Sequence, residues 1–298
     1  MLTPPALKIG DTVALICTAR KIDVTELQFA VELFNNWGLK VVMGKSIYLS
    51  EHQFAGNDKA RANDLQNMLN DKNIKAIVVA RGGYGTVRII DKIDFSIFKQ
   101  HPKWVVGYSD ITVLHSHIHK HCKIETLHAP MPVGFEKNTE SSLNNLRRIL
   151  FNETIQYNFK TVCPNKPGNA EGELIGGNLS VLCSINGSIS DINTDRKILF
   201  IEDLDEYLYH IDRMIMQLKR SGKLSKLKAL LVGGFTEMKD NTVPFGKSAY
   251  EIIAEHVSEF SYPVAFNIHA GHISDNNPLI FGRKIKVNIT EKSCDIFF

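Results

Sequence analysis

The chain has 298 residues, of which 44% are hydrophobic and 22% are charged. These fractions are ordinary for a folded globular protein, so disordered, fibrous and coiled-coil classes are excluded. Lys and Arg number 35 against 32 Asp and Glu, a net charge of +3 with no long basic run, so nucleic acid is not an expected partner.

The cysteines and the apolar segments indicate a cytoplasmic location. The five cysteines are widely spaced and form no Cys-x-x-Cys pair, which favours reduced thiols over disulfides, a zinc site or a redox motif. No stretch approaches the roughly 18 apolar residues of a membrane span, so no membrane partner is expected. We interpret the apolar segment 12–19, which Arg20 and Lys21 follow, as a buried strand rather than a signal sequence.

The first part of the chain alternates between strand and helix patterns. Residues 74–80 are apolar except for Lys75, typical of a parallel strand covered on both faces. Further strands are predicted at 12–17, 39–43 and 104–108, and helices at 24–37, 58–69, 87–93 and 110–121. This βαβα order predicts a doubly wound, flavodoxin-like α/β domain with a parallel sheet over residues 1–135.

The pattern weakens over residues 136–168, which we expect to be a linker region. It carries a polar helix at 141–150 and a Pro/Gly/Asn stretch at 164–169. The segments beyond it predict a glycine-rich turn (Gly172, Gly176, Gly177), a helix to 185, strands at 197–201, 229–232 and 264–267, helices at 209–219 and 248–255, and two short strands near the end. Residues 169–298 are therefore expected to form a smaller, mixed α/β C-terminal domain.

A serine at the bend between a strand and a helix is the first candidate for chemistry. The strand 104–108 passes through Gly107 into Ser109 and Asp110. This is the layout of a nucleophile elbow, which places Oγ beside helix N-terminal amides that can bind an oxyanion. Ser followed by Asp is also a common helix N-cap and first-turn pair, and the second glycine of Gly-x-Ser-x-Gly is missing. The segment alone leaves both alternatives open.

A glycine-rich segment, Arg81 to Gly85, follows the strand 74–80. Its glycines allow backbone N–H groups to approach a ligand, either as a phosphate cradle or as a second oxyanion donor. The spacing is not that of a dinucleotide-binding Gly-x-Gly-x-x-Gly, and no acidic residue follows as a ribose partner. A tight strand-to-helix turn without a ligand is the other interpretation.

Acidic residues and two histidines follow predicted strands of the second part. Glu202 comes directly after the strand 197–201, where α/β enzymes collect functional groups, and is suited to orient a histidine. The acids within residues 202–206 are equally compatible with a solvated loop or a hard-cation site, although their spacing is not that of an EF-hand. His269 and His272 lie in a glycine-containing loop, and each is a candidate base.

Four histidines alternate along the predicted helix 110–121. In the run His115, His117, His119 and His121, the i,i+4 pairs point in different directions, and no Glu lies inside it as in His-Glu-x-x-His. We therefore expect a partly exposed helix face rather than a metal site.

Taken together, these segments resemble the LD-carboxypeptidase family of serine peptidases, which includes the murein tetrapeptide (muramoyltetrapeptide) carboxypeptidases and their microcin-immunity relatives. Eight segments, spread over nearly the whole chain, follow the family's order: 54–58 (FAGND), 81–85 (RGGYG), 107–112 (GYSDIT), 128–131 (HAPM), 172–179 (GELIGGNL), 200–203 (FIED), 209–213 (YHIDR) and 270–272 (AGH). Two places depart from it. Residues 16–19 (ICTA) replace a frequent Pro- and Ser-containing turn, and Ala129 replaces a frequent Gly.

The resemblance implies a Ser–Glu–His triad split between the two parts of the chain. Ser109 would be the nucleophile, His272 the general base and acid, and Glu202 the acceptor that fixes the imidazole tautomer. The backbone N–H groups of Gly83 and Asp110 would form the oxyanion hole. His272 matches the family's Gly-His, whereas His269 stands where the family often has Pro.

The implied reaction is hydrolysis of the bond between the L-centre of meso-diaminopimelate (or Lys) and a terminal D-Ala in a murein tetrapeptide, in cytoplasmic peptidoglycan recycling. The resemblance also implies a homodimer that needs no metal and no cofactor. Its microcin-immunity branch implies an alternative, cleavage of an aminoacyl-nucleotide peptide amide.

Two other function classes rest on the fold alone. The first is a nucleotide-binding α/β protein that uses residues 81–85, which predicts that a nucleotide raises the melting temperature. The second is a non-catalytic binding module that keeps the fold, which the presence of all three triad residue types disfavours.

Overall fold

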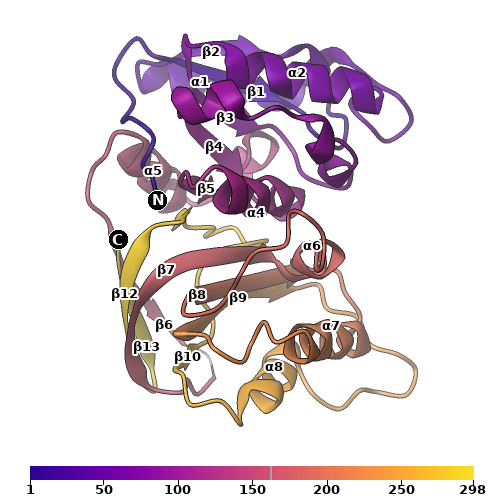
Figure 1. Cartoon of the computed structure of the whole chain (residues 1–298), viewed down its shortest axis with the longest axis vertical. Helices are drawn as coiled ribbons and strands as arrows, with labels where there is room; N and C mark the ends of the chain where they lie inside the picture. Colours follow the sequence, from indigo (N-terminus) through magenta and orange to yellow (C-terminus); the bar gives the residue numbers. More distant parts are fainter. Residues whose placement is uncertain (162) are drawn as a thin grey trace.

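Two β-sheets organise the chain (Figure 1). The computed structural model describes residues 1–161 and 163–298. In this described part, the first sheet has the strand order β11-β5-β4-β3-β1-β2. Its strands are β1 Thr12–Ile16, β2 Lys40–Met43, β3 Ile74–Val79, β4 Trp104–Gly107, β5 Thr126–His128 and β11 Leu279–Phe281. Strands β1 to β5 are parallel, in the order 2-1-3-4-5 of flavodoxin-like folds, which confirms the predicted class.

Helices cover both faces of the first sheet, which explains why every residue of β3 except Lys75 is apolar and buried. The helices are α1 Gln28–Asn36, α2 Asp58–Asn70, α3 Ser96–Gln100 and α4 Thr112–His121. Residues 24–27 form a 3-10 turn before α1, so the first predicted helix has two parts. Residues 87–93, predicted as one helix, instead belong to two 3-10 turns, Thr86–Arg88 and Ile90–Lys92.

The second sheet is mixed, as predicted for the C-terminal part. Its order is β10-β9-β8-β7-β12-β13-β6, with β7 to β10 parallel and the other three strands antiparallel. The strands are β6 Gln156–Lys160, β7 Gly168–Asn178, β8 Ile198–Leu204, β9 Ala229–Thr236, β10 Val264–Ala265, β12 Lys284–Ile289 and β13 Ser293–Phe297. Helices α6 Leu179–Ser184, α7 Leu208–Arg220 and α8 Ala249–Val257 pack on the face that β8 lines with Leu199 and Ile201.

The opposite face of β8 points toward the first sheet. Alternate residues of a strand face opposite sides, so Ile198 and Phe200 enter the larger core cluster together with Leu15 and Leu127 of the first sheet. By the same period, Glu202 continues this inner face, and Asp203 lies on the helix-covered face. The two sheets therefore share a core, and Glu202 is directed at their junction.

Several sequence predictions for the second part are wrong. The glycines expected in a turn lie inside β7, and Gly176 is needed because a Cβ there would lie 1.9 Å from the carbonyl oxygen of Phe200. Within residues 136–168, helix α5 Glu140–Leu150 confirms the helix predicted at 141–150, whereas the strand β6 was not predicted. Three strands rather than two end the chain, and one of them, β11, pairs with β5 in the first sheet.

The predicted domain boundaries, 1–135, 136–168 and 169–298, stay a prediction. Among the described residues, every helix is too short or too polar to cross a bilayer.

Candidate active site

Ser109 occupies a strained turn between β4 and α4. Its φ is +62°, in the left-handed region that residues with a Cβ rarely adopt, and such outliers cluster at functional sites. The 3-10 turn Ser109–Ile111 leads into α4, and the residue at the N-cap position is Tyr108. An N-cap residue has extended backbone, so the N-cap interpretation of Ser109 is wrong and the predicted elbow geometry is present.

The glycine-rich segment lies against this turn. A Cβ on Gly82 would lie 3.0 Å from Cβ and 3.2 Å from Oγ of Ser109, so a side chain there would crowd the serine. Gly83 has φ +106°, a conformation that favours glycine. The structure therefore brings the backbone after β3 beside the serine after β4, at the carboxyl edge of the parallel sheet where ligands of such folds bind.

Two buried charged side chains hold this segment, and sequence reasoning missed both roles. Asp110 accepts the backbone N–H of Thr86 at 2.9 Å. Arg61, which is fully buried on α2, donates to the carbonyl oxygens of Gly85 at 3.0 Å and Thr18 at 2.5 Å, and pairs with Asp58. A buried guanidinium needs its donors satisfied, so it fixes the carbonyls around it.

Glu202 and His272 form a buried pair on the second sheet. His272 Nδ1 donates to Glu202 Oε2 at 2.6 Å, and the His272 backbone N–H lies 3.3 Å from the same oxygen. This contact leaves Nε2 available as the proton acceptor. Burial acts to lower the pKa of His272, but the charge of Glu202 and its hydrogen bond outweigh it, so the pKa is raised above its ordinary value of 6.5.

A glycine before the histidine permits this pair. Gly271 has φ +106°, and a Cβ on it would lie 2.7 Å from Glu202 Oε2. Its backbone N–H donates to Asn276 Oδ1 at 2.8 Å, which anchors the loop. A side chain at position 271 would therefore collide with Glu202, which explains why a glycine precedes His272 in the sequence.

The acids within residues 202–206 do not form a solvated loop as a group. Strand β8 extends to Leu204, so Glu202 and Asp203 are buried within it, whereas Asp205 is exposed. Asp203 accepts hydrogen bonds from the Asn178 side chain and the Ser180 backbone, each at 2.9 Å. Burial and the neighbouring Glu202 raise the pKa of Asp203 to about 7.

Contacts across the junction bring the serine turn next to the Glu–His pair. The Asn178 backbone N–H donates to Thr112 Oγ1 of α4 at 3.0 Å, so one residue links the helix that follows Ser109 to Asp203. The ring of Tyr108, which directly precedes Ser109, packs on the ring of His272 with centroids 4.7 Å apart. Sequence reasoning missed both contacts, because their partners are far apart in the chain.

The second loop histidine has other partners. His269 Nδ1 lies 2.9 Å from Asp275 Oδ2, and its ring stacks on Phe159 with centroids 5.1 Å apart. Of the two candidates, only His272 contacts Glu202 in the described structure.

Three of the four histidines in the run on α4 are buried and His121 is exposed, so the helix face is less exposed than predicted. His115, His117 and His119 are at most 8% exposed, and each contacts a different residue: Thr126, Ser190 and Glu173, respectively. His121 contacts the Ile189 carbonyl. In the chain as described, no three His, Cys, Asp or Glu side chains gather as a metal-ion site.

Comparison with known proteins gives matches over both parts of the chain. Residues 13–129 match the model of the LD-carboxypeptidase N-terminal domain, and residues 171–287 match that of the LD-carboxypeptidase C-terminal domain. A probable murein peptide carboxypeptidase of Bacillus subtilis is 38% identical, over 98% of this chain and 93% of the relative.

Solved structures agree with the fold. The muramoyltetrapeptide carboxypeptidase from Oxalobacter formigenes has a TM-score of 0.87 and 26% identity, over 96% of this chain and 97% of its own. MccF in complex with glutamyl sulfamoyl guanosine has a TM-score of 0.90 and 22% identity, over 100% and 99% of the two chains, and this likeness concerns the fold alone.

Proposed function

This chain belongs to the LD-carboxypeptidase family, and from that premise we propose that it is a serine-type LD-carboxypeptidase that removes the terminal D-Ala from a murein tetrapeptide. The single observation that carries the proposal is the buried Glu202–His272 pair beside the strained Ser109 turn. The names of the relatives from Bacillus subtilis and Oxalobacter formigenes support the substrate class.

In the proposed reaction, Ser109 Oγ attacks the carbonyl carbon of the scissile amide, and His272 Nε2 takes the hydroxyl proton. The resulting oxyanion accepts hydrogen bonds from the backbone N–H groups of Gly83 and Asp110. Glu202 stabilises the imidazolium and holds its tautomer. The amide C–N bond then breaks, and His272 returns the proton to the amino group of the departing D-Ala.

The second half of the reaction uses the same groups. The acyl group remains on Ser109 as an ester, and water attacks the ester carbonyl while His272 Nε2 takes a proton from it. Collapse of the intermediate returns the proton to Ser109 Oγ and releases the tripeptide acid. The balance is one amide and one water consumed, and one carboxylic acid and one amine formed, with no metal or cofactor required.

A carboxypeptidase must also recognise the free carboxylate of the terminal residue. Arg20 is exposed, and its side chain packs along the proposed oxyanion residue, since a Cβ on Gly83 would lie 3.0 Å from Cβ and 3.4 Å from Cδ of Arg20. A guanidinium matches a carboxylate in shape and charge. We therefore assign the D-Ala carboxylate to Arg20.

We propose that the protein is a homodimer that acts in peptidoglycan recycling in the cytoplasm. All five cysteines are free thiols, which suits a reducing compartment.

The structural likeness to MccF favours one alternative substrate, an aminoacyl-nucleotide peptide amide, for the same Ser109 chemistry. One experiment separates the two. The protein is incubated in parallel with the murein tetrapeptide and with an aminoacyl sulfamoyl adenosine, and the products are weighed by mass spectrometry. Loss of D-Ala supports the proposal, whereas cleavage of the second compound alone favours the alternative substrate instead.

Activity should survive EDTA, because the oxyanion hole supplies the stabilisation that a metal ion otherwise would.

A further inference from the structure

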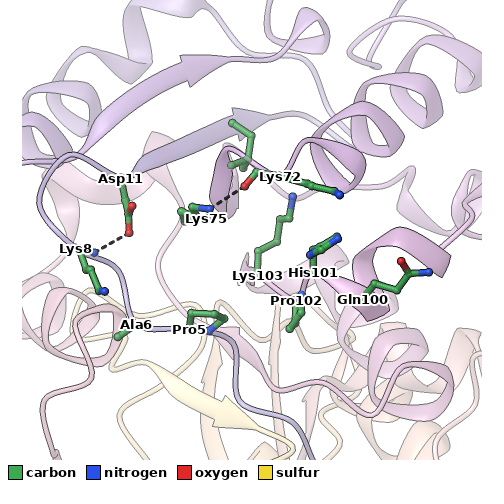
Figure 2. Close-up of a pocket in the computed structure, with 11 residues that line it drawn as sticks. Pro5, Ala6, Lys8, Asp11, Lys72, Lys75, Gln100, His101, Pro102 and Lys103 are labelled. Carbon is green, nitrogen blue, oxygen red and sulfur yellow. Dashed lines mark hydrogen bonds between the residues drawn. The ribbon is translucent and has the colours of Figure 1, made fainter.

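A hollow of about 480 Å³ lies at one edge of the first sheet. Figure 2 shows the residues that line it. Asp11 and Lys103 come just before β1 and β4, and Ile74 begins β3, so the hollow lies at the amino ends of these strands. Ser109 and Gly83 follow the carboxyl ends of the same sheet. The hollow is therefore separate from the proposed active site.

Positive charge dominates the wall of this hollow. Lys8, Lys72, Lys75 and Lys103 line it, against the single carboxylate of Asp11. Asp11 accepts the Lys8 backbone N–H at 2.8 Å, and the Lys75 ammonium donates to the carbonyl oxygen of Lys72 at 2.8 Å. In the described part of the chain, no ion pair joins any of the four ammonium groups to a carboxylate. The cavity thus carries an excess of unneutralised cations.

Lys103 shows that this charge is built into the fold. The residue is only 2% exposed, and its ammonium donates to the carbonyl oxygens of Met68 at 2.9 Å and Asp71 at 2.5 Å, at the end of α2. These bonds use two of its three N–H donors. A buried ammonium without a carboxylate partner is costly, and an anion in the hollow would compensate it. Burial lowers the pKa of Lys103 to about 8, although the nearby charge of Asp71 acts in the opposite direction.

We propose that this hollow binds a small compound that carries two or more phosphate groups. Four lysines provide compact charges of the kind that hold phosphate oxygens, and phosphate brings more negative charge per group than a carboxylate. Pro5, Ala6 and Pro102 add an apolar wall for an organic substituent. The volume falls in the range of small-ligand sites, and the charge is gathered in one concavity rather than along the stripe that a nucleic acid follows.

Calorimetry of the full chain tests this proposal. Sodium tripolyphosphate and ATP are titrated separately, at fixed ionic strength and without divalent cations, into the wild type and two double variants. Lys72→Glu/Lys75→Glu changes exposed residues of the hollow. Lys284→Glu/Lys286→Glu makes the same charge change at an exposed pair on β12 and is the matched control. We expect the first pair to weaken binding by about tenfold or more, and the control pair by less than about twofold.

Comparison of the two probes, together with NMR as a second measurement, distinguishes the possible outcomes. Tighter binding of ATP supports a nucleoside polyphosphate, and equal binding supports an inorganic polyphosphate. Absence of binding at millimolar concentrations, or equal weakening by both double variants, overturns the proposal. Amide NMR shifts on addition of tripolyphosphate should appear at Lys72, Lys75 and Lys103. Shifts confined to Gly83 and Asp110 would place the anion in the active site and likewise overturn it.

Discussion

The carboxylate of Asp110 accepts the backbone N–H of Thr86, and this bond joins the two halves of the proposed oxyanion hole. Asp110 directly follows Ser109, the proposed nucleophile, and Thr86 follows the glycine-rich segment. Arg61 holds the Gly85 carbonyl from the other side. Two buried groups therefore fix the separation of the Gly83 and Asp110 amides before any substrate arrives, the preorganisation that electrostatic catalysis requires.

Replacing Ser109 should separate activity from stability. Ser109→Ala and Ser109→Gly should both lose D-Ala release by at least about 10³-fold, because a triad does not work without its nucleophile. Ser109→Gly should also gain roughly 1 kcal/mol of unfolding free energy, since glycine relieves the cost of a positive φ. Mass spectrometry and urea denaturation measure the two effects. Activity of Ser109→Ala above a tenth of the wild type would disprove the nucleophile assignment.

The two loop histidines should differ in their importance. His272→Ala should reduce activity as much as Ser109→Ala, and the double variant should be scarcely worse, because triad members act as a unit. His269→Ala should be milder, since the side-chain contacts that it removes are with Asp275, Phe159 and Asn267 rather than with Glu202. Initial rates of D-Ala release give the ranking, and the reverse order would show that His269 is the base.

The pH profile should report the environment of His272. The base must be neutral, and the pKa of His272 is raised, so kcat/KM should fall as the pH drops, with a midpoint above about 6.5. In Glu202→Gln the negative charge is absent while burial remains, which lowers the pKa of His272 and moves this midpoint to lower pH. The rate should fall by up to about 10⁴-fold. An unshifted midpoint would indicate that another group titrates.

Weakening the support of the glycine-rich segment should lower kcat more than it changes KM. Arg61→Lys keeps a charge but cannot reproduce the contacts with Gly85, Thr18 and Asp58, so the Gly83 amide loses its position. We expect a loss of up to about 10²-fold in kcat. Arg88→Lys, an exposed partner of the same Asp58, is the control and should stay near the wild type. Equal effects of both substitutions would contradict the role of Arg61.

Arg20 should determine the preference for a free carboxylate. Arg20→Ala should raise KM for the tetrapeptide acid by about tenfold or more, and leave KM for the C-terminal amide nearly unchanged. Lys21→Ala, which removes the neighbouring exposed charge, should alter neither. Steady-state kinetics on the acid and amide substrates test this. If the ratio of the KM values for the acid and the amide did not change, Arg20 would not recognise the carboxylate. The proposed reaction class would still stand.

Local patterns were sufficient for the parts of the fold that neighbours in sequence determine. The apolar run of β3, the α/β alternation and the strand-to-helix bend at Ser109 follow from periodicity and turn chemistry. The pairing of Glu202 with His272 depended on the resemblance to a family, because the two residues lie 70 positions apart. No spacing rule connects them.

The failures have a common physical cause, which is long-range packing. The glycines of β7 suggest a turn until β8 is placed beside them, and Tyr157 and Phe159 make a strand only when β13 pairs with it. The α4 histidines are buried by residues such as Glu173 and Ser190, which sequence reasoning could not place. Sequence reasoning did not single out Arg61, because its buried partners come from three separate loops.

Strand β11 imposes an order on the assembly of the molecule. It pairs with β5, although about 150 residues of chain separate the two. During synthesis on the ribosome, this edge of β5 would stay unpaired until almost the whole polypeptide had been made, because synthesis proceeds from the N-terminus. Strands β12 and β13 of the second sheet follow still later, so both sheets are completed only near the end of synthesis. A fragment that stops before residue 279 would keep an unpaired strand edge on β5, next to the Ser109 turn.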